Sequence, residues 1–386
     1  MIPYSRQEIS EDDIAEVRKV LRSDFLTQGP VVSKFEKKVA NYCGANYAVA
    51  MNSATSALHI ACLALDLGKG DWLWTSPNTF VASANCGLYC DAFVDFVDID
   101  SLTYNMCPIH LEKKLIQARQ DNNLPKVVVP VHFAGQSCDM KRIYKLSQEY
   151  GFKIIEDASH AIGGEYLKNK IGCCQYSDIA VFSFHPVKII TTAEGGMAVT
   201  NNEELTNRIR RLSTHGITRD KALMLPRSEN EIWNYQQIEL GFNYRMNELQ
   251  AALGVSQMNR LDEFIERRHI LRKRYDHMLS EFPLVLPYQS EDSYSALHLY
   301  PIQIKLDKIS KTHFQVFDEM QKNGIGVNLH YIPVHTHPYY QKIGFKFGSF
   351  PNSENYFSQT ISIPLFYGMT FEQQDKVVQI LREVLL

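Results

Sequence analysis

Short apolar runs rich in β-branched residues alternate with amphipathic stretches over the first two thirds of the chain. The runs cover residues 47–51, 71–77, 92–99, 126–133, 152–157, 179–184 and 196–200. Helical patterns lie between several of them, for example at 56–65 and 140–150. Apolar runs bounded by turns and separated by helices predict an α/β fold with a mostly parallel central sheet covered on both faces. Ligands of such sheets bind beyond the carboxyl ends of the strands, so residues at those ends are the first candidates for a site.

The pattern changes after about residue 245. Residues 247–282 form one long helical pattern, which exceeds a typical globular helix and therefore predicts a bend or register shift. A strand-like run, a helix, an apolar segment and a final helix follow at 298–306, 312–323, 326–334 and from about Thr370. We expect a large domain over 1–250 and a smaller α+β domain over 251–386. No linker rich in Gly, Ser or Pro separates them, so the long helix is the expected connector.

Composition and charge narrow the class of protein. The 386 residues are 45% hydrophobic and 22% charged, which is typical of a globular chain and excludes a disordered, collagen-like or coiled-coil protein. The formal net charge of −3 gives no global basic field to hold nucleic acid or an anionic membrane. The basic run at 266–274 is typical of a solvated helix face. A local site for a small anion remains compatible with this charge.

The sequence gives no sign of an export signal or a membrane span. The first 13 residues are polar and acidic, unlike a secretory signal, and no run of 18 apolar residues predicts a membrane span. The eight cysteines all lie in the first half and form no Cys-x-x-Cys pair. We interpret them as reduced, mostly buried residues. The sequence therefore predicts a cytoplasmic protein.

A carboxylate and an amine follow two neighbouring apolar runs. Asp157 ends one run, and Lys188 comes shortly after Ser183 at the end of the next. A cofactor pyridine nitrogen needs a carboxylate to stay protonated, and a carbonyl cofactor needs an amine to form a Schiff base. A partly desolvated lysine with a lowered pKa is the better nucleophile for that step. The alternative is that Asp157 caps a helix and Lys188 lies on the surface.

A second cluster, NSATSALH at 52–59, follows a strand and opens a helix. Its small residues let backbone N–H groups approach a phosphate, and the helix dipole with the Thr55 and Ser56 hydroxyls adds to this. The segment lacks the G-x-x-x-x-G-K pattern of a P-loop. The alternative is an ordinary helix cap.

Several further motifs occur in one order along the chain. They are SATSALH, SPNTFVASAN, VDID, PVHFAGQSCDM, IIEDASHAIG, FSFHPVK, TTAEGG and ELGFNYRMNELQAALG. Together they resemble the DegT/DnrJ/EryC1/StrS family of sugar aminotransferases, which are pyridoxal-phosphate enzymes of fold type I, the aspartate-aminotransferase fold. The resemblance runs from residues 26–30 through 330–340, nearly the whole chain.

The resemblance implies a role for each matching residue. Lys188 is the expected Schiff-base lysine and Asp157 the partner of the pyridinium nitrogen. The residues expected to form the phosphate cup are Thr55, Ser56 and Ser183. Phe80 is expected to cover the cofactor ring, and His160 to contact its phenolic oxygen. Asn243 is expected to reach the phosphate bound by a neighbouring subunit, which implies a homodimer with shared active sites. Arg245, His330 and Tyr331 are the expected substrate-binding residues.

Two departures from the broad family pattern point to a subgroup. His160 stands where many members have glutamine, and Ala193 stands where glycine is commoner. These departures favour the subgroup that aminates C4 of UDP-2-acetamido-2,6-dideoxy-β-L-arabino-hexos-4-ulose, a UDP-linked 4-keto sugar, on the route to pseudaminic acid. The resemblance implies L-glutamate as the amino donor.

Other functions remain open. One is amination at C3 or C4 of a dTDP- or GDP-linked keto sugar, and another is a non-catalytic regulator that binds pyridoxal phosphate. A family dehydratase would carry histidine in place of Lys188. His335 and His337 have a metal-ligand spacing, but no carboxylate or cysteine lies near them in sequence, so we expect no metal site.

Overall fold

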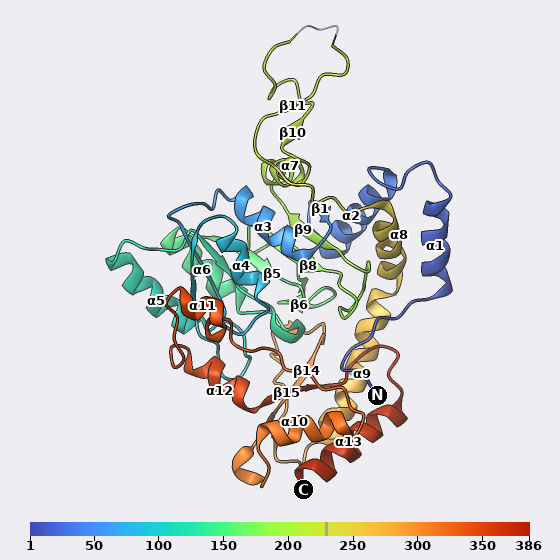
Figure 1. The fold of residues 1–386 in the computed structure, drawn as a ribbon, viewed down its shortest axis with the longest axis vertical. Helices are drawn as coiled ribbons and strands as arrows, with labels where there is room; N and C mark the ends of the chain where they lie inside the picture. Colours follow the sequence, from blue (N-terminus) through green and yellow to red (C-terminus); the bar gives the residue numbers. More distant parts are fainter. Residues whose placement is uncertain (228–230) are drawn as a thin grey trace.

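A seven-stranded sheet forms the centre of the computed structural model, which describes residues 1–227 and 231–386 (Figure 1). Its order is β1-β9-β8-β5-β4-β2-β3. Only β9 runs antiparallel to its neighbours. The strands are β1 (Tyr47–Met51), β2 (Trp72–Thr75), β3 (Phe93–Phe96), β4 (Val127–Val129), β5 (Lys153–Asp157), β8 (Ile179–Ser183) and β9 (Gly196–Thr200). The predicted mostly parallel sheet is confirmed.

Helices cover both faces of this sheet, as predicted. In β4, Val127 and Val129 face one apolar core and Val128 faces another, because successive side chains of a strand point to opposite faces. The first core also contains residues of α3 (Ala54–Ala64), α4 (Ala82–Leu88) and α7 (Glu203–Leu212). The opposite face packs against α2 (Pro30–Cys43) and α8 (Glu248–Gln257) at one end, and α5 (Pro108–Gln120) and α6 (Met140–Tyr150) at the other.

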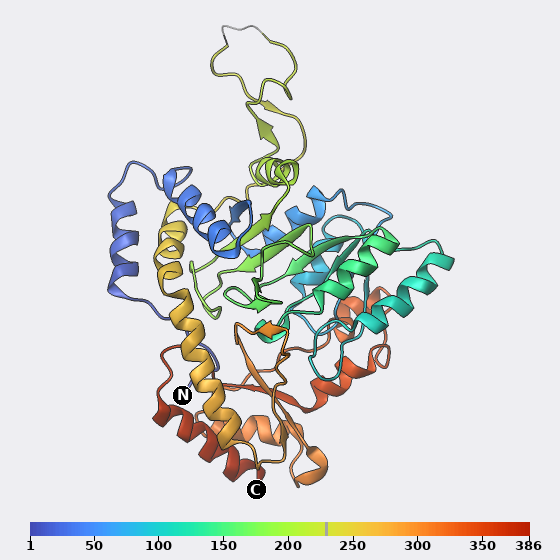
Figure 2. The same ribbon diagram turned by 180° about the vertical axis from the view of Figure 1, so that it is seen from behind.

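The long helical pattern is interrupted, as its length predicted. After α8 comes a tighter turn, η2 (Met258–Arg260), and then α9 (Leu261–Met278). Figure 2 shows these elements descending one side of the molecule. Up to Ile265 the helix packs into a core of the large sheet, whereas from Leu271 it packs into a C-terminal core. We therefore propose that the boundary between the expected domains lies within α9.

The C-terminal core surrounds a three-stranded antiparallel sheet. Its strands are β12 (Leu284–Val285), β14 (Tyr300–Ile304) and β15 (Thr360–Ile363), and α10 (His313–Lys322) and α13 (Phe371–Leu385) pack against it with α9. The apolar segment 326–334 adds no regular strand. Only Asn328 pairs with Ser362 in the backbone, and the chain then turns toward the large sheet, where Tyr331 N–H donates to Asn78 Oδ1 at 3.2 Å.

The remaining elements lie around these two sheets. A hairpin with β10 (Ile217–Thr218) and β11 (Gln236–Gln237) projects from the body in both views (Figures 1 and 2). The others are α1 (Glu11–Leu21), η1 (Phe133–Gly135), β6 (Glu165–Tyr166), β7 (Asn169–Lys170), β13 (Ser293–Tyr294), η3 (Leu306–Lys308), η4 (Val334–Thr336), α11 (Pro338–Lys342) and α12 (Pro351–Gln359). Among the described residues, no helix has the length and apolar character needed to cross a membrane.

A buried carboxylate joins α8 to the start of α2. Glu248 is fully buried, and its carboxylate accepts backbone N–H groups of Gly29 at 3.0 Å and Val31 at 2.7 Å. These N–H groups have no partner inside α2, because the first turn of a helix leaves its donors free. The negative charge also lies at the positive end of the helix dipole.

Replacing this carboxylate should destabilise the fold. We expect Glu248→Ala to lower the free energy of unfolding by about 3 kcal/mol, because it strands buried donors that now bond to a charged group. Urea denaturation would measure the change. Glu112→Ala, which removes an exposed ion pair with Arg142, should change it by less than about 0.5 kcal/mol. Equal effects of the two substitutions would contradict the capping role.

Candidate active site

A cavity of about 540 Å³ lies beyond the carboxyl ends of β5 and β8. This is where a mostly parallel sheet predicts a ligand site. Eight of the residues predicted from sequence border it: Thr55, Phe80, Asp157, His160, Ser183, Lys188, His330 and Tyr331. Segments far apart in the chain therefore converge on one pocket, which we call the strand-end pocket.

Lys188 lies in the loop that follows β8. Burial lowers its pKa to about 8, although the nearby Asp157 carboxylate partly opposes that shift by favouring the ammonium. The loop is held by Lys188 N–H donating to the His185 carbonyl at 2.9 Å and by Thr192 N–H donating to the Phe184 carbonyl at 2.9 Å. A lysine with this pKa is partly neutral near pH 8 and can act as a nucleophile or move a proton.

Asp157 is buried at the end of β5. Its carboxylate accepts the Ser83 hydroxyl at 2.6 Å and the Ser159 N–H at 3.1 Å. Residues 158–163 form a turn, so Asp157 does not cap a helix. The carboxylate is held rigidly while it borders the pocket, which suits the partner of a protonated ring nitrogen.

The first turn of α3 forms another wall. Ser53 is the cap residue, and its Oγ accepts the Ser56 N–H at 3.1 Å. Ser56 is itself buried, does not border the pocket, and donates its hydroxyl to Asn52 Oδ1 at 2.7 Å. A Cβ on Gly196 would lie 2.4 Å from the Ser53 carbonyl carbon, so the missing side chain lets the helix start seat against β9. Ser53 and Thr55 thus reach the pocket, whereas Ser56 supports the cap.

Three histidines lie around Lys188. Burial is the main cause that lowers the pKa of His160, and the positive charge of Lys188 adds to it. The same two causes lower the pKa of His330 to about 3. His160 Nε2 lies 3.0 Å from the Tyr331 hydroxyl, and the rings of His160 and His298 have centroids 4.4 Å apart. Burial likewise lowers the pKa of His298, so all three imidazoles are neutral near neutral pH.

Sequence reasoning missed several residues of this wall, including Tyr4, His298 and Asn328. Tyr4 and His298 come from segments whose local pattern carries no sign of a site, whereas Asn328 lies two residues before the predicted His330. Tyr4 lies in the N-terminal segment, where the Ser5 hydroxyl donates to the Val187 carbonyl at 2.8 Å and so ties the chain start to the loop of Lys188.

The structure describes groups that fit each part of the predicted cofactor. A rigid buried carboxylate suits the pyridine nitrogen, and an amine with a lowered pKa suits the carbonyl. The free N–H donors at the start of α3 suit the phosphate. Phe80 borders the pocket and is 59% exposed, so its ring is free to cover a bound group.

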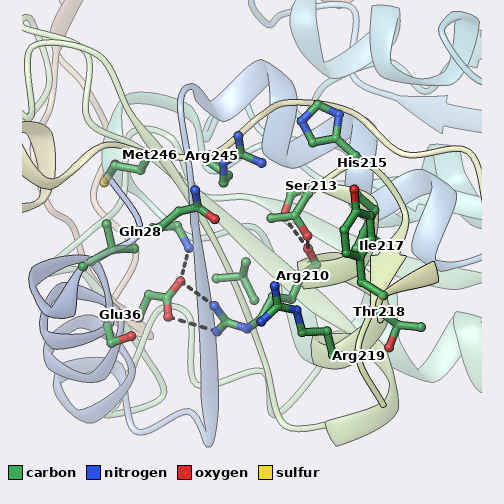
Figure 3. Close-up of a pocket in the computed structure, with 17 residues that line it drawn as sticks. Gln28, Glu36, Arg210, Ser213, His215, Ile217, Thr218, Arg219, Arg245 and Met246 are labelled. Carbon is green, nitrogen blue, oxygen red and sulfur yellow. Dashed lines mark hydrogen bonds and ion pairs between the residues drawn. The ribbon is translucent and has the colours of Figure 1, made fainter. Parts of the chain in front are cut away.

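Asn243 and Arg245 lie outside the strand-end pocket. Asn243 is exposed, and its backbone pairs with Thr214. Arg245 borders a second cavity of about 620 Å³ beside β1 and α7, which we call the arginine pocket. Figure 3 shows Arg245, His215 and Arg219 around this cavity.

One arginine of this second cavity is already neutralised. Arg210 binds the buried Glu36, with Nη2 2.9 Å from Oε2. Arg219 and Arg245 form no ion pair with any residue that the structure describes. The arginine pocket therefore presents unpaired positive charge, which suits an anionic group.

The sequence model of the DegT/DnrJ/EryC1/StrS aminotransferase family matches residues 7–382. The chain belongs to this family. As an aminotransferase of the family, it is similar over its whole length to curated relatives. It is 40% identical to the spore coat polysaccharide biosynthesis protein SpsC of Bacillus subtilis, over 99% of this chain and 97% of that one. It is 35% identical to the UDP-4-amino-4,6-dideoxy-N-acetyl-beta-L-altrosamine transaminase of Campylobacter jejuni, over 100% and 98%.

Solved structures of similar proteins have the same fold. Helicobacter pylori PseC, an aminotransferase involved in the biosynthesis of pseudoaminic acid, superposes with a TM-score of 0.90 at 29% identity, over 100% of this chain and 99% of that one. The PLP-form of Spr1654 from Streptococcus pneumoniae gives a TM-score of 0.88 at 27% identity, over 100% of both chains. The predicted family and the predicted fold type I are confirmed.

One departure from the family pattern carries a backbone cost. Ala193 has a φ of +65°, in the left-handed region that glycine adopts more readily. We expect Ala193→Gly to raise the free energy of unfolding by about 1 kcal/mol, measured by urea denaturation. As the matched control, Ala252→Gly within α8 should lower it by about 1 kcal/mol or more. A destabilising Ala193→Gly would show that the alanine methyl makes a packing contribution larger than this strain.

Proposed function

We propose that this DegT-family aminotransferase moves the amino group of L-glutamate to C4 of a UDP-linked 4-keto-6-deoxy-N-acetylhexosamine. Lys188 and Asp157 border one pocket beyond the strand ends, and this observation carries the proposal. The names of the Campylobacter and Helicobacter proteins support the choice of sugar. The reaction takes place in the cytoplasm under this proposal.

Pyridoxal phosphate is the cofactor of this chain. When bound, it supplies a carbonyl that takes up the amino group and a ring that stabilises negative charge on the adjacent carbon. Asp157 would hold the proton on the ring nitrogen, and Ser53, Thr55 and Ser183 at the start of α3 and the end of β8 would hold the phosphate. Phe80 would cover one face of the ring.

Lys188 would accept and release a proton at its Nζ when the cofactor and substrate are bound. Its pKa of about 8 lies near neutral pH, so this side chain can both accept and release a proton. His330 and Tyr331 border the same pocket. The Tyr331 hydroxyl, which lies 3.0 Å from His160 Nε2, keeps hydrogen-bonding capacity for a hydroxyl or amide group of a sugar, whereas both nitrogens of His330 already have partners and its ring would contact the sugar by packing.

The arginine pocket supplies the charge that a nucleotide diphosphate requires. We place Asn243 and Arg245 of a second copy at the active site of the first, because both lie outside their own chain's strand-end pocket. The enzyme is then a homodimer with shared sites. Unpaired arginines at a subunit boundary would bind the diphosphate without any basic field over the whole protein.

A dTDP- or GDP-linked keto sugar is the alternative substrate. It would use the same strand-end pocket, and the choice of nucleotide would depend on residues around the arginine pocket. A non-catalytic regulator is a weaker alternative, since such a protein does not need the lowered pKa of Lys188.

Lys188→Arg tests the catalytic assignment. Arginine keeps the positive charge but stays protonated, so we expect loss of the visible absorbance of bound cofactor and a fall in turnover of at least about 10³-fold. Lys153→Arg, at an exposed ion pair with Asp178, is the matched control and should leave both unchanged. Normal transamination by Lys188→Arg would contradict the catalytic role of Lys188.

A panel of 4-keto nucleotide sugars tests the substrate. The enzyme is incubated with L-glutamate and UDP-, dTDP- and GDP-linked 4-keto sugars, and amination is followed by mass spectrometry. We expect conversion of the UDP-linked N-acetylated sugar and formation of 2-oxoglutarate in equal amount. Conversion of only the dTDP or GDP sugars would replace the preferred substrate by the alternative.

Mixing two inactive variants tests the shared site. Lys188→Ala and Asn243→Ala should each be inactive alone, but their co-refolded mixture should regain about a quarter of wild-type activity, because half of the dimers form with one intact site. Absence of recovery, with mixed dimers demonstrated by native mass spectrometry, would place Asn243 at the site of its own chain or at neither.

A further inference from the structure

His298 borders the strand-end pocket and is held there by its backbone. It lies just before β14, where its N–H donates to the Ala134 carbonyl at 2.9 Å. Its carbonyl accepts a hydrogen bond at 3.3 Å from the fully buried Arg268, whose guanidinium also binds the carbonyls of Leu297 and Leu365. The position of the imidazole is therefore fixed before any ligand arrives.

The ring of His298 has an unused polar atom. The side chain is 2% exposed, and its Nδ1 is buried without a hydrogen-bond partner. Its Nε2 is not among the buried unpaired atoms and makes no hydrogen bond within the described residues, so Nε2 is the nitrogen open to the cavity. A buried N–H without an acceptor is costly, which favours the tautomer with the proton on Nε2.

The other two histidines of the pocket offer no free nitrogen to the cavity, since His160 Nδ1 has no partner among the described residues but is buried. His160 Nε2 is 3.0 Å from the Tyr331 hydroxyl. His330 uses both nitrogens, with Nδ1 2.9 Å from Ser362 Oγ and Nε2 3.3 Å from Asn328 Nδ2. Among the three, only His298 keeps a pocket-facing nitrogen for a ligand.

The charges around the pocket indicate that an anionic ligand would need a neutral hydrogen-bond donor. Lys188 is the only lysine or arginine among the described residues that border it. The carboxylates Asp157 and Glu194 border it as well. An anionic oxygen inside the pocket must therefore be held largely by neutral donors. His298 is such a donor, because burial first and then the positive charges of nearby residues lower its pKa and keep the imidazole neutral.

We propose that His298 is a further ligand-contacting residue of this active site, whose Nε2–H donates a hydrogen bond to an anionic oxygen of the bound ligand. That oxygen is either the phenolic oxygen on the ring of the cofactor or a carboxylate oxygen of the amino donor, since both are anionic hydrogen-bond acceptors. The proposal rests on the proposed function, since both ligands belong to it.

Two spectroscopic measurements separate the sources. The first follows the absorbance of bound pyridoxal phosphate against pH without an amino donor. The second measures the dissociation constant of succinate, a dicarboxylate probe, from the change in the same absorbance. If His298 contacts the ring oxygen, His298→Phe should change the acidity of the bound cofactor by about tenfold. If it contacts the carboxylate, the same variant should change the dissociation constant of succinate by about tenfold. Either change corresponds to the loss of a hydrogen bond to a charged group.

Two variants control for packing. His298→Gln keeps an amide N–H near the position of Nε2 and should restore most of the shifted quantity. Leu299→Ala removes a buried neighbour that does not border the pocket, so it should lower the melting temperature without moving either quantity. A merely structural role of His298 would give the opposite pattern, with similar effects of Leu299→Ala and His298→Phe.

The outcomes distinguish this proposal from the proposed function. A wild-type protein that retains no pyridoxal phosphate overturns both. Wild-type protein that binds the cofactor, together with a His298→Phe variant that matches it in both measurements, overturns only the contact by His298. If His298→Phe does not fold, wild-type protein labelled with ¹⁵N-histidine decides the matter. The Nε2 signal that is absent in His298→Gln should shift on adding pyridoxal phosphate or succinate, and an unmoved signal overturns the contact.

Discussion

A lysine and a carboxylate share one partly dry pocket, and the cost of removing both from water governs how the site is built. Burial pulls the pKa of Lys188 down, and Asp157 opposes that shift. Asp157 in turn accepts a hydroxyl and a backbone N–H, so its charge is stabilised without a direct ion pair to the lysine. The result is an amine poised to react beside a carboxylate that remains available to a ring nitrogen.

The same constraint shapes the surroundings of this pair. A second cation close to Lys188 would raise the free energy of both positive charges. The neighbouring histidines avoid this repulsion because they are neutral. Hydrogen bonds from neutral rings, hydroxyls and amides then provide recognition within the strand-end pocket. Arg219 and Arg245, which have no ion pair within the described residues, lie instead in the arginine pocket, where an anionic group would bind at less electrostatic cost to the lysine.

Much of the fold and the residues at the centre of the candidate site could be predicted from sequence, because both depend on local patterns. The apolar runs of the sheet mark strand ends, where Asp157 and Ser183 are the last residues of β5 and β8 and Lys188 lies in the loop that follows Ser183. His298 and Tyr4 could not be found in this way, since they reach the pocket only through the packing of the C-terminal core and the chain start. The inward role of Ser56 in the helix cap and the strained φ of Ala193 likewise depend on contacts with distant residues.

The covalent attachment point tests the account most directly. The protein is loaded with pyridoxal phosphate and reduced with borohydride, which fixes an imine as a stable amine, and its peptides are then sequenced by mass spectrometry. We expect a single pyridoxyl group on the peptide that contains Lys188. A label on another lysine, or none on a protein that demonstrably binds the cofactor, would contradict it.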